Sequence, residues 1–299
     1  LFTLVTCSAN AITILCGSRC KPLQKAHNLF VVSLAVTDFS IGIFAMPFMA
    51  MYTIYGYWPI SRSFCVLWAL VEATCSTVSI ATMCLIAYDR CLALTNPLEY
   101  GQPSRKRTVV IQICVTWVVA LLAQSVVGII ETSSVEPPIK ECFVVPSNKH
   151  ILISITLTFE IPIVLLVLLY ARCLYYLRKR LFSVDPKGEK SQAPALRPSH
   201  VSSATSGSTG TSVLSVAPLT NRRQSHVRGI RNLGLIIGTF LFCWLPFCFL
   251  FIIRAYCLDC ISNGWYAYSF WAGYLNSVVN PMLYFLSNPN FRMAFIKLI

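Results

Sequence analysis

The sequence contains few charged residues. Asp, Glu, Lys and Arg together make up 12% of its 299 residues, whereas soluble domains carry roughly 25%. Apolar residues account for 56% of the chain, and they gather in runs that are long enough to cross a bilayer. This composition excludes an ordinary soluble domain and predicts a membrane protein.

The chain also lacks the side-chain combinations of common enzymes and metal sites. Most of its 14 cysteines stand singly within apolar runs, as small buried hydrophobic residues do. We find no pairing of a nucleophile with a base and no set of metal ligands at typical spacing. Repeated halves with broken helices, which are typical of transporters, are absent as well. We therefore expect neither an enzyme nor a transporter.

Acidic residues are scarce, because 11 of them stand against 24 basic residues and leave a net charge of +13. The basic residues lie between apolar runs, around positions 19–25, 105–107, 178–180 and 222–231. Cytoplasmic loops of membrane proteins accumulate Lys and Arg. The positive charge therefore needs no nucleic-acid partner, and it places these segments inside the cell and the N-terminus outside.

Seven apolar segments predict seven membrane-spanning helices. They cover residues 1–16, 28–52, 64–94, 109–130, 151–176, 234–253 and 265–286. Prolines inside several of them are tolerated where neighbouring helices bond the freed carbonyl groups. Because the chain shows neither an initial Met nor a signal peptide, we expect its first helix to be truncated.

Two further segments have a different character. Residues 183–221 are rich in Ser, Thr, Pro and Gly, which predicts a disordered third cytoplasmic loop. Residues 289–299 have an amphipathic pattern, which predicts a short eighth helix along the inner membrane surface. We thus expect residues 1–299 to form a single all-α domain, a seven-transmembrane-helix bundle with a short amphipathic eighth helix.

Charged residues mark both ends of the third segment. Glu72 and Arg90 are 18 residues apart, about five turns and roughly 27 Å of helix, so they share one face. An ionisable group in the hydrocarbon region is costly and usually functional. No basic residue within the apolar parts of the spans can pair with Glu72, which favours a cationic ligand over a structural ion pair or a neutral buried acid. Asp89 can pair locally with its neighbour Arg90.

Short motifs occur along the chain in the order of a known family. They are Asn10, Ser33-Leu-Ala-Val-Thr-Asp38, Asp89-Arg90, Trp117, Pro162 with Tyr170, Phe240-x-x-Cys243-Trp244-Leu-Pro246 and Asn280-Pro281-x-x-Tyr284. Through these motifs the chain resembles the rhodopsin-like (class A) G protein-coupled receptors, over its whole length except residues 183–221. A light receptor is not expected, because the position of the Schiff-base lysine holds Tyr274 and the seventh segment contains no Lys.

Within this family the chain resembles the biogenic-amine receptors, through Trp271-x-x-Tyr274-x-Asn276-Ser277, Ser76-Thr77 and Phe247. The amine counterion of those receptors maps onto Glu72, where they normally carry Asp. The extra methylene advances the carboxylate by roughly 1.5 Å. The resemblance implies a small cationic amine as ligand, a heterotrimeric G protein and arrestin as partners, and the lipid bilayer of the plasma membrane as location. The alternative is a class A receptor for a non-amine ligand, such as a peptide or a lipid.

The resemblance also implies sets of site residues. A carboxylate and aromatic faces attract an ammonium group, and the implied ligand-binding residues are Glu72, Ser76, Ser154, Thr158, Trp244, Phe247, Phe251, Trp271 and Tyr274. Coupling and activation are implied for Asp89, Arg90, Leu98, Tyr170, Asn280, Pro281 and Tyr284, with a transmission triad of Ile80, Pro162 and Phe240. The resemblance implies no cofactor apart from a sodium ion, whose ligands would be Asp38, Ser79, Asn276, Ser277 and Asn280.

Cysteine pairs are the last expectation. The resemblance implies a disulfide between Cys65 and Cys142, and an extracellular location permits it. Cys257 and Cys260 in the last outer loop favour a second, short-loop disulfide over free thiols.

Several of these assignments have an alternative. The aromatic stripe of the sixth segment is also compatible with ordinary helix packing. Ser154 and Thr158 often bond back to the preceding carbonyl in helices, and the polar cluster around Asp38 suits water as well as sodium. Glu160 has no role in the family that we can transfer. We expect it in an outward or interhelical position near a hydrogen-bond donor, and not in contact with the ligand.

Overall fold

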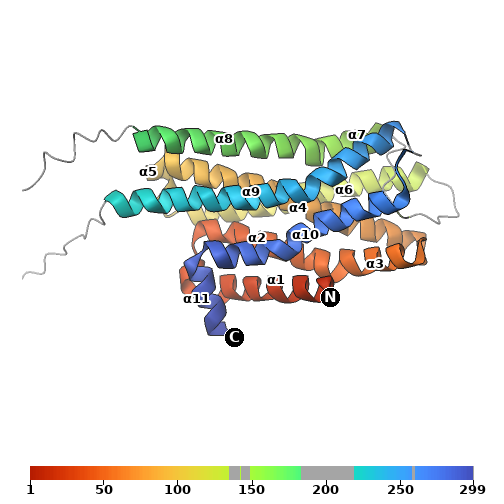
Figure 1. Ribbon diagram of the computed structural model, residues 1–299, viewed down its shortest axis with the longest axis horizontal. Helices are drawn as coiled ribbons and strands as arrows, with labels where there is room; N and C mark the ends of the chain where they lie inside the picture. Colours follow the sequence, from red (N-terminus) through yellow and green to blue (C-terminus); the bar gives the residue numbers. More distant parts are fainter. Residues whose placement is uncertain (135–141, 143–148, 183–218, 258–259, 299) are drawn as a thin grey trace, which may run out of the picture.

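The computed structural model describes residues 1–134, 142, 149–182, 219–257 and 260–298. Within this part of the chain the secondary structure is helical and contains no strand. Long helical rods lie side by side along the length of the molecule, and α11 turns away from them near the C-terminus (Figure 1).

Seven rods form the bundle. They are α1 (Phe2–Arg19), α2 with η2 and α3 (Ala26–Ser40, Ile41–Ala45, Met46–Tyr55), α4 (Arg62–Thr95), α6 (Arg105–Ser134), α7 with η3 and α8 (Lys149–Ile155, Thr156–Glu160, Ile161–Phe182), α9 (Leu219–Tyr256) and α10 (Asn263–Ser287). Short helices lie between or after them: η1 (Lys21–Leu23), α5 (Pro97–Tyr100) and α11 (Pro289–Leu298).

Five helical segments of the described chain are long and apolar enough to cross a membrane: Ala26–Tyr55, Arg62–Thr95, Arg105–Ile129, Leu152–Lys179 and Val227–Tyr256. The two remaining rods, α1 and α10, are less apolar, but they pack against α2 and α9 and against each other. Large apolar side chains such as Leu122, Leu168 and Phe242 are exposed on the outside of the bundle, where lipid replaces water as the solvent. The seven-helix membrane bundle expected from the sequence is thereby confirmed.

The long helix α4 lies at the centre of the bundle, in contact with α2, α6, α8 and α9. It begins after Ser61, whose hydroxyl caps the helix by accepting a hydrogen bond from the backbone N–H of Phe64 at 3.4 Å. Since α4 carries Glu72 near one end and Asp89 near the other, its packing fixes both ends of the molecule relative to each other.

Two rods contain a short π-helix, η2 at Ile41–Ala45 and η3 at Thr156–Glu160. Each stands just before a proline, Pro47 or Pro162. A proline ring clashes with the carbonyl group four residues earlier, and local widening of the helix relieves this clash. Each widened turn also rotates the residues on one side of it relative to those on the other.

Some boundaries differ from expectation. The sixth rod begins at Leu219 rather than at residue 234, because polar residues continue the helix beyond the apolar run. The last three residues of the expected disordered loop, 219–221, are therefore helical, and residues 183–218 lie outside the described part of the chain. Helix α11 matches the expected eighth helix in position, while its contact with a membrane surface stays a prediction.

Candidate ligand-binding and coupling sites

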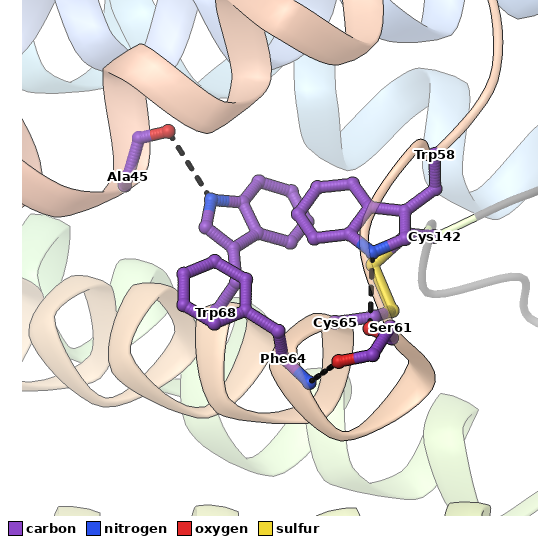
Figure 2. The surroundings of a disulfide bond; sticks show 7 residues. All are labelled: Ala45, Trp58, Ser61, Phe64, Cys65, Trp68 and Cys142. Atoms are coloured by element: carbon purple, nitrogen blue, oxygen red, sulfur yellow. Dashed lines mark hydrogen bonds between the residues drawn. A yellow bond between two sulfur atoms is a disulfide. The ribbon is translucent and has the colours of Figure 1, made fainter.

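A disulfide joins Cys65, in the first turn of α4, to Cys142 (Figure 2), with their Cα atoms 5.8 Å apart. Cys142 is 2% exposed, so this residue is held against the beginning of α4. A second disulfide joins Cys257 and Cys260, between α9 and α10. Both pairings match the expectation. We call this end of the bundle the disulfide end, and the opposite one the Asp89 end.

Two tryptophans stabilise the disulfide end (Figure 2). The rings of Trp58 and Trp68 lie 5.3 Å apart. Trp58 donates its indole N–H to the carbonyl of Ser61 at 3.3 Å, and Trp68 donates to the carbonyl of Ala45 at 3.2 Å, at the end of η2. The segment before α4 and the second rod are therefore fixed relative to the disulfide.

Beneath the disulfide lies a cavity of about 140 Å³. Six of the predicted ligand-binding residues line it: Glu72, Ser76, Ser154, Thr158, Trp244 and Phe247. They come from α4, α7, η3 and α9, so the bundle brings together residues that are up to 175 positions apart in the sequence (72 to 247). We call this space the Glu72 cavity.

Glu72 is 8% exposed and accepts a hydrogen bond from the hydroxyl group of Tyr274 on α10. Among the described residues no Lys, Arg or His forms an ion pair with it. A buried carboxylate without a basic partner attracts a cation strongly, because the low dielectric of the interior screens its charge poorly. The cavity can therefore accept a positively charged group beside Glu72.

Aromatic rings form the wall near Glu72. The ring centroid of Trp244 lies 5.2 Å from that of Phe159 and 5.9 Å from that of Phe247. The ring centroids of Phe247 and Phe270 are 5.1 Å apart. All four side chains line the cavity. Their faces add a favourable interaction with a cation, at about 0.5–2 kcal/mol each.

The hydroxyl residues of the fifth rod line the same cavity. Thr158 donates its hydroxyl hydrogen to the backbone carbonyl of Ser154 at 2.8 Å. This is the bond to a preceding carbonyl group that Ser and Thr often form in helices. Both side chains nevertheless border the space that a ligand would fill. Glu160 accepts a hydrogen bond from Thr156 at 3.1 Å, within η3. The expected donor is therefore present, and it comes from the same rod.

The cavity residues that sequence reasoning missed include one polar and two aromatic side chains. Gln124 on α6 lines it and donates to the hydroxyl of Thr77 at 2.9 Å. A lone amide within an apolar span is a signal that could have identified it. Phe159 and Phe270 look like ordinary packing residues in the sequence, although Phe270 lies one helical turn before Tyr274, on the same face of α10.

Three predicted ligand-binding residues do not line the Glu72 cavity. Phe251 is buried against Phe247, with ring centroids 5.7 Å apart. Trp271 and Tyr274 line a second cavity of about 350 Å³, together with the exposed side chains Phe242 and Tyr268. Tyr274 reaches the first cavity through its hydrogen bond to Glu72. The structure thus places it between the two spaces.

A polar cluster lies in the middle of the bundle around Asp38, which is fully buried. Asn280 donates to this carboxylate at 2.8 Å, the hydroxyl of Ser277 also hydrogen-bonds it, and Asn10 donates to the carbonyl of Ser277 at 3.0 Å. Within the described chain, buried oxygen atoms without a hydrogen-bond partner belong to Asn10, Asp38, Ser79, Asn276 and Asn280. Oxygen atoms of this kind suit a hard cation or water.

At the Asp89 end, the carboxylate of Asp89 forms an ion pair with Arg105 at the start of α6. The expected pairing of Asp89 with Arg90 is wrong, because consecutive helical residues point in directions roughly 100° apart and do not face each other. Tyr100 donates its hydroxyl to Asp89 at 3.3 Å. Burial, together with the nearby Asp89 charge, raises the pKa of Tyr100, so its hydroxyl remains a neutral donor.

Two predicted coupling residues of the Asp89 end are open to a partner. Arg90 is half-buried and forms no ion pair with any residue that the structure describes. Leu98 on α5 is 90% exposed. An exposed apolar side chain and a cation without a carboxylate partner among the described residues both suit a protein-binding surface.

The predicted activation residues lie between the two ends. Ile80 and Phe240 are fully buried in one apolar cluster, and the carbonyl of Pro162 accepts a hydrogen bond from the Cys84 thiol at 3.4 Å. The ring centroids of Phe240 and Trp244 are 6.1 Å apart. The triad is therefore in continuous contact with the wall of the Glu72 cavity.

Two tyrosines among the predicted coupling and activation residues have distinct surroundings. The hydroxyl of Tyr170 lies against Gly234 on α9 and occupies the space that a Cβ atom would need there. Tyr284, just after Pro281 in α10, is buried with its hydroxyl unpartnered among the described residues, and its ring lies 6.2 Å from Phe291 on α11. Tyr170 thus depends on a glycine for its position.

These features define the class of protein: a seven-helix membrane receptor with a buried acid in a cavity at one end and an Asp-Arg pair at the other. The chain belongs to the rhodopsin family, because the family model described as 7 transmembrane receptor (rhodopsin family) matches residues 9–284. It is therefore a class A G protein-coupled receptor and not an enzyme.

Known relatives include receptors for a biogenic amine. The chain is 31% identical to the 5-hydroxytryptamine receptor 1B of Oryctolagus cuniculus, of Mus musculus and of Homo sapiens, over 329 aligned positions in each case. These alignments cover 100% of this chain and 84%, 85% and 84% of the three relatives.

Proposed function

We propose that this receptor binds a small cationic amine in the Glu72 cavity and activates a heterotrimeric G protein at its Asp89 end. The observation that carries the proposal is the position of Glu72, a buried acid on a cavity wall without a basic partner in the described chain. An ammonium group beside it gains the attraction of the carboxylate and of the surrounding aromatic rings. The 5-hydroxytryptamine receptors among the relatives take a ligand that also carries an ammonium group at neutral pH.

Ligand binding and coupling are linked through α4 and α9. Glu72 and Asp89 both lie on α4, and Trp244 joins the cavity wall to the Ile80–Phe240 packing. A ligand that shifts Trp244 would repack this cluster and release the Asp89 end, where Arg90 and Leu98 would meet the G protein. An active receptor of this family is also expected to recruit arrestin.

The proposed location is the plasma membrane, with the disulfide end and the N-terminus outside the cell. Lys and Arg residues gather at the Asp89 end. They include Arg105, Lys106 and Arg107, and others lie at the C-terminal end of α8 and in the first half of α9, in agreement with the positive-inside rule. The disulfides lie at the opposite end, and disulfides persist in the oxidising extracellular medium. The exposed apolar belt then faces the lipid bilayer.

We also propose that the Asp38 cluster binds a sodium ion. Asp38, Ser79, Asn276, Ser277 and Asn280 supply one carboxylate and several neutral oxygens, and a number of these have no partner within the described residues. The ion would balance the buried charge of Asp38 and stabilise the resting packing of α2 against α10.

The test of the amine proposal is a screen of amines, including 5-hydroxytryptamine, with G protein activation measured in cells that express the receptor. We expect at least one small amine to activate the wild-type receptor and to lose potency in Glu72→Gln. Activation by a peptide or a lipid, with no response to any amine, would replace the proposal with the non-amine alternative.

A further inference from the structure

Arg254, in the last turn of α9, is a buried cation near the disulfide end. Its side chain is 5% exposed, and its Nη2 donates to the side-chain oxygen of Asn263 at 2.8 Å. Its guanidinium carbon lies 4.5 Å from the ring centroid of Tyr266. The Nε and Nη1 groups have no hydrogen-bond partner, and no carboxylate pairs with this guanidinium, within the described part of the chain.

This arrangement leaves the guanidinium only partly satisfied. Arginine stays charged at every accessible pH and offers five donors. Contact with the Tyr266 ring contributes only about 0.5–2 kcal/mol, whereas a buried donor without a partner costs about 1–3 kcal/mol. A carboxylate or phosphate would satisfy the free Nε and Nη1 groups, because it matches the planar fork of the guanidinium.

Aromatic rings connect Arg254 to the Glu72 cavity. Tyr266, which carries the guanidinium on its ring, lies 6.4 Å from Phe247 and 5.4 Å from Phe270. Phe247 and Phe270 both line the cavity. Packed rings therefore link the wall of the Glu72 cavity to Arg254.

The two charged groups lie at opposite ends of this path. Tyr266 precedes Tyr274, the partner of Glu72, by eight residues on α10, which corresponds to roughly 12 Å along the helix. Arg254 follows Phe247 by seven residues on α9, or roughly 10 Å. The acid and the guanidinium are thus separated by roughly 10–12 Å along the bundle.

We infer that Arg254 binds an anionic group of the ligand, so that the natural ligand is an elongated zwitterion. Its ammonium group lies beside Glu72, its apolar middle lies along Phe247, Phe270 and Tyr266, and its carboxylate or phosphate lies at Arg254. Asn263 is a positioning residue, since it bonds the guanidinium through Nη2 and leaves the other two groups free. The inference rests on the proposed function, because it requires that an amine binds at Glu72.

A series of straight-chain α,ω-amino acids provides the probes. Each acid, from 5-aminopentanoic to 11-aminoundecanoic acid, is compared with its methyl ester in a displacement assay on membranes that contain the full receptor. We expect the acid to bind about 10- to 100-fold more tightly than its ester at the chain length that spans roughly 10–12 Å. The ω-aminoalkyl phosphate of that length then shows which anion binds better.

Variants assign the gain to the guanidinium. Arg254→Gln should reduce the ratio of acid to ester affinity to about one, and Arg254→Lys should retain part of it, because the charge remains without the fork. Arg62→Gln, which removes a positive charge at the same end of the bundle, is the matched control and should leave the ratio unchanged. Surface expression and hexylamine binding show that each variant is folded.

The outcomes separate the two proposals. Equal affinity of acid and ester at every length, or an unchanged ratio in Arg254→Gln, overturns the anion site while Glu72-dependent binding of hexylamine leaves the amine proposal intact. Failure of all amines and zwitterions to bind overturns both. A ratio that collapses in Arg254→Gln and persists in Arg62→Gln establishes the site.

Discussion

The carboxylate of Asp89 and the guanidinium of Arg105 lie 2.6 Å apart, where the end of α4 meets the start of α6. Both side chains are largely buried, at 1% and 10% exposure, so the pair is poorly screened by water. The ring of Tyr100 lies 5.8 Å from the same guanidinium. The pair therefore holds α4, α5 and α6 together and leaves Arg90 without that acid as a partner.

Breaking this pair should raise basal signalling. Arg105→Gln leaves Asp89 buried without its cation, which costs about 3–5 kcal/mol in comparable sites and weakens the contact between α4 and α6 in the resting state. We expect higher G protein activity without ligand, measured at matched surface expression. Arg107→Gln, at an exposed position two residues away, is the control. Equal basal activity of the two variants would contradict the prediction.

Glu72→Gln should weaken amine binding by two to four decades. The substitution keeps the shape of the side chain and removes its charge, which leaves the ligand cation buried without a partner at a cost of about 3–5 kcal/mol. Radioligand displacement on membranes measures the effect. Retention of wild-type affinity by a variant that reaches the cell surface would exclude Glu72 as the counterion.

Two milder variants refine that result. Glu72→Asp retracts the carboxylate by roughly 1.5 Å, so the order of affinities among large and small amines should change. Tyr274→Phe removes the donor to Glu72 and should alter affinity by about tenfold, the typical size of one hydrogen bond to a charged group. If Glu72 had only a structural role, these variants would change receptor expression and leave the order of amine affinities unchanged.

Gly234→Ala should impair activation by displacing Tyr170. The new Cβ atom would overlap the Tyr170 hydroxyl, and the ring would have to leave its place against α9. Agonist potency in a G protein assay should fall, and adding Tyr170→Phe should restore part of it because the hydroxyl is the nearest group. Gly238→Ala, one helical turn away with open space around its Cβ position, is the matched control. If both alanine variants changed agonist potency equally, the cause would be the higher helix propensity of alanine and not the displacement of Tyr170.

Asp38→Asn should abolish any effect of sodium on agonist binding. A monovalent cation that stabilises the resting packing lowers agonist affinity in proportion to its occupancy, and loss of the carboxylate removes the main attraction. Agonist affinity measured in sodium chloride and in N-methylglucamine chloride gives the sodium effect for each receptor. If sodium changed agonist affinity equally in the wild type and in Asp38→Asn, the ion would bind at a site other than the Asp38 cluster.

Much of the fold could be predicted because a membrane span imposes a long apolar run, and runs of this kind are visible in the sequence. The positions of Glu72, Trp244 and Phe247 in one cavity followed from the family motifs together with helical spacing. The Asp89–Arg105 pair could not be foreseen, since it depends on how the turn after Thr95 returns the chain to α4. The cavity residues Phe159 and Phe270 were equally hidden, because an apolar residue shows in sequence that it is buried but not which space it borders.

The π-helix Thr156–Glu160 lies between the two halves of the fifth rod, α7 and α8. It sets the direction in which the side chains of α7 point relative to those of α8. Loss of one residue from this segment would turn Ser154 by roughly 100° about the helix axis while Pro162 and its packing partners kept their places. A single-codon deletion would thus change which fifth-rod residues face the cavity, while the walls from the other helices and the half of the rod after Pro162 stayed as they are. A change of one residue in the length of this rod would therefore reshape the binding site without any substitution of a residue that lines it.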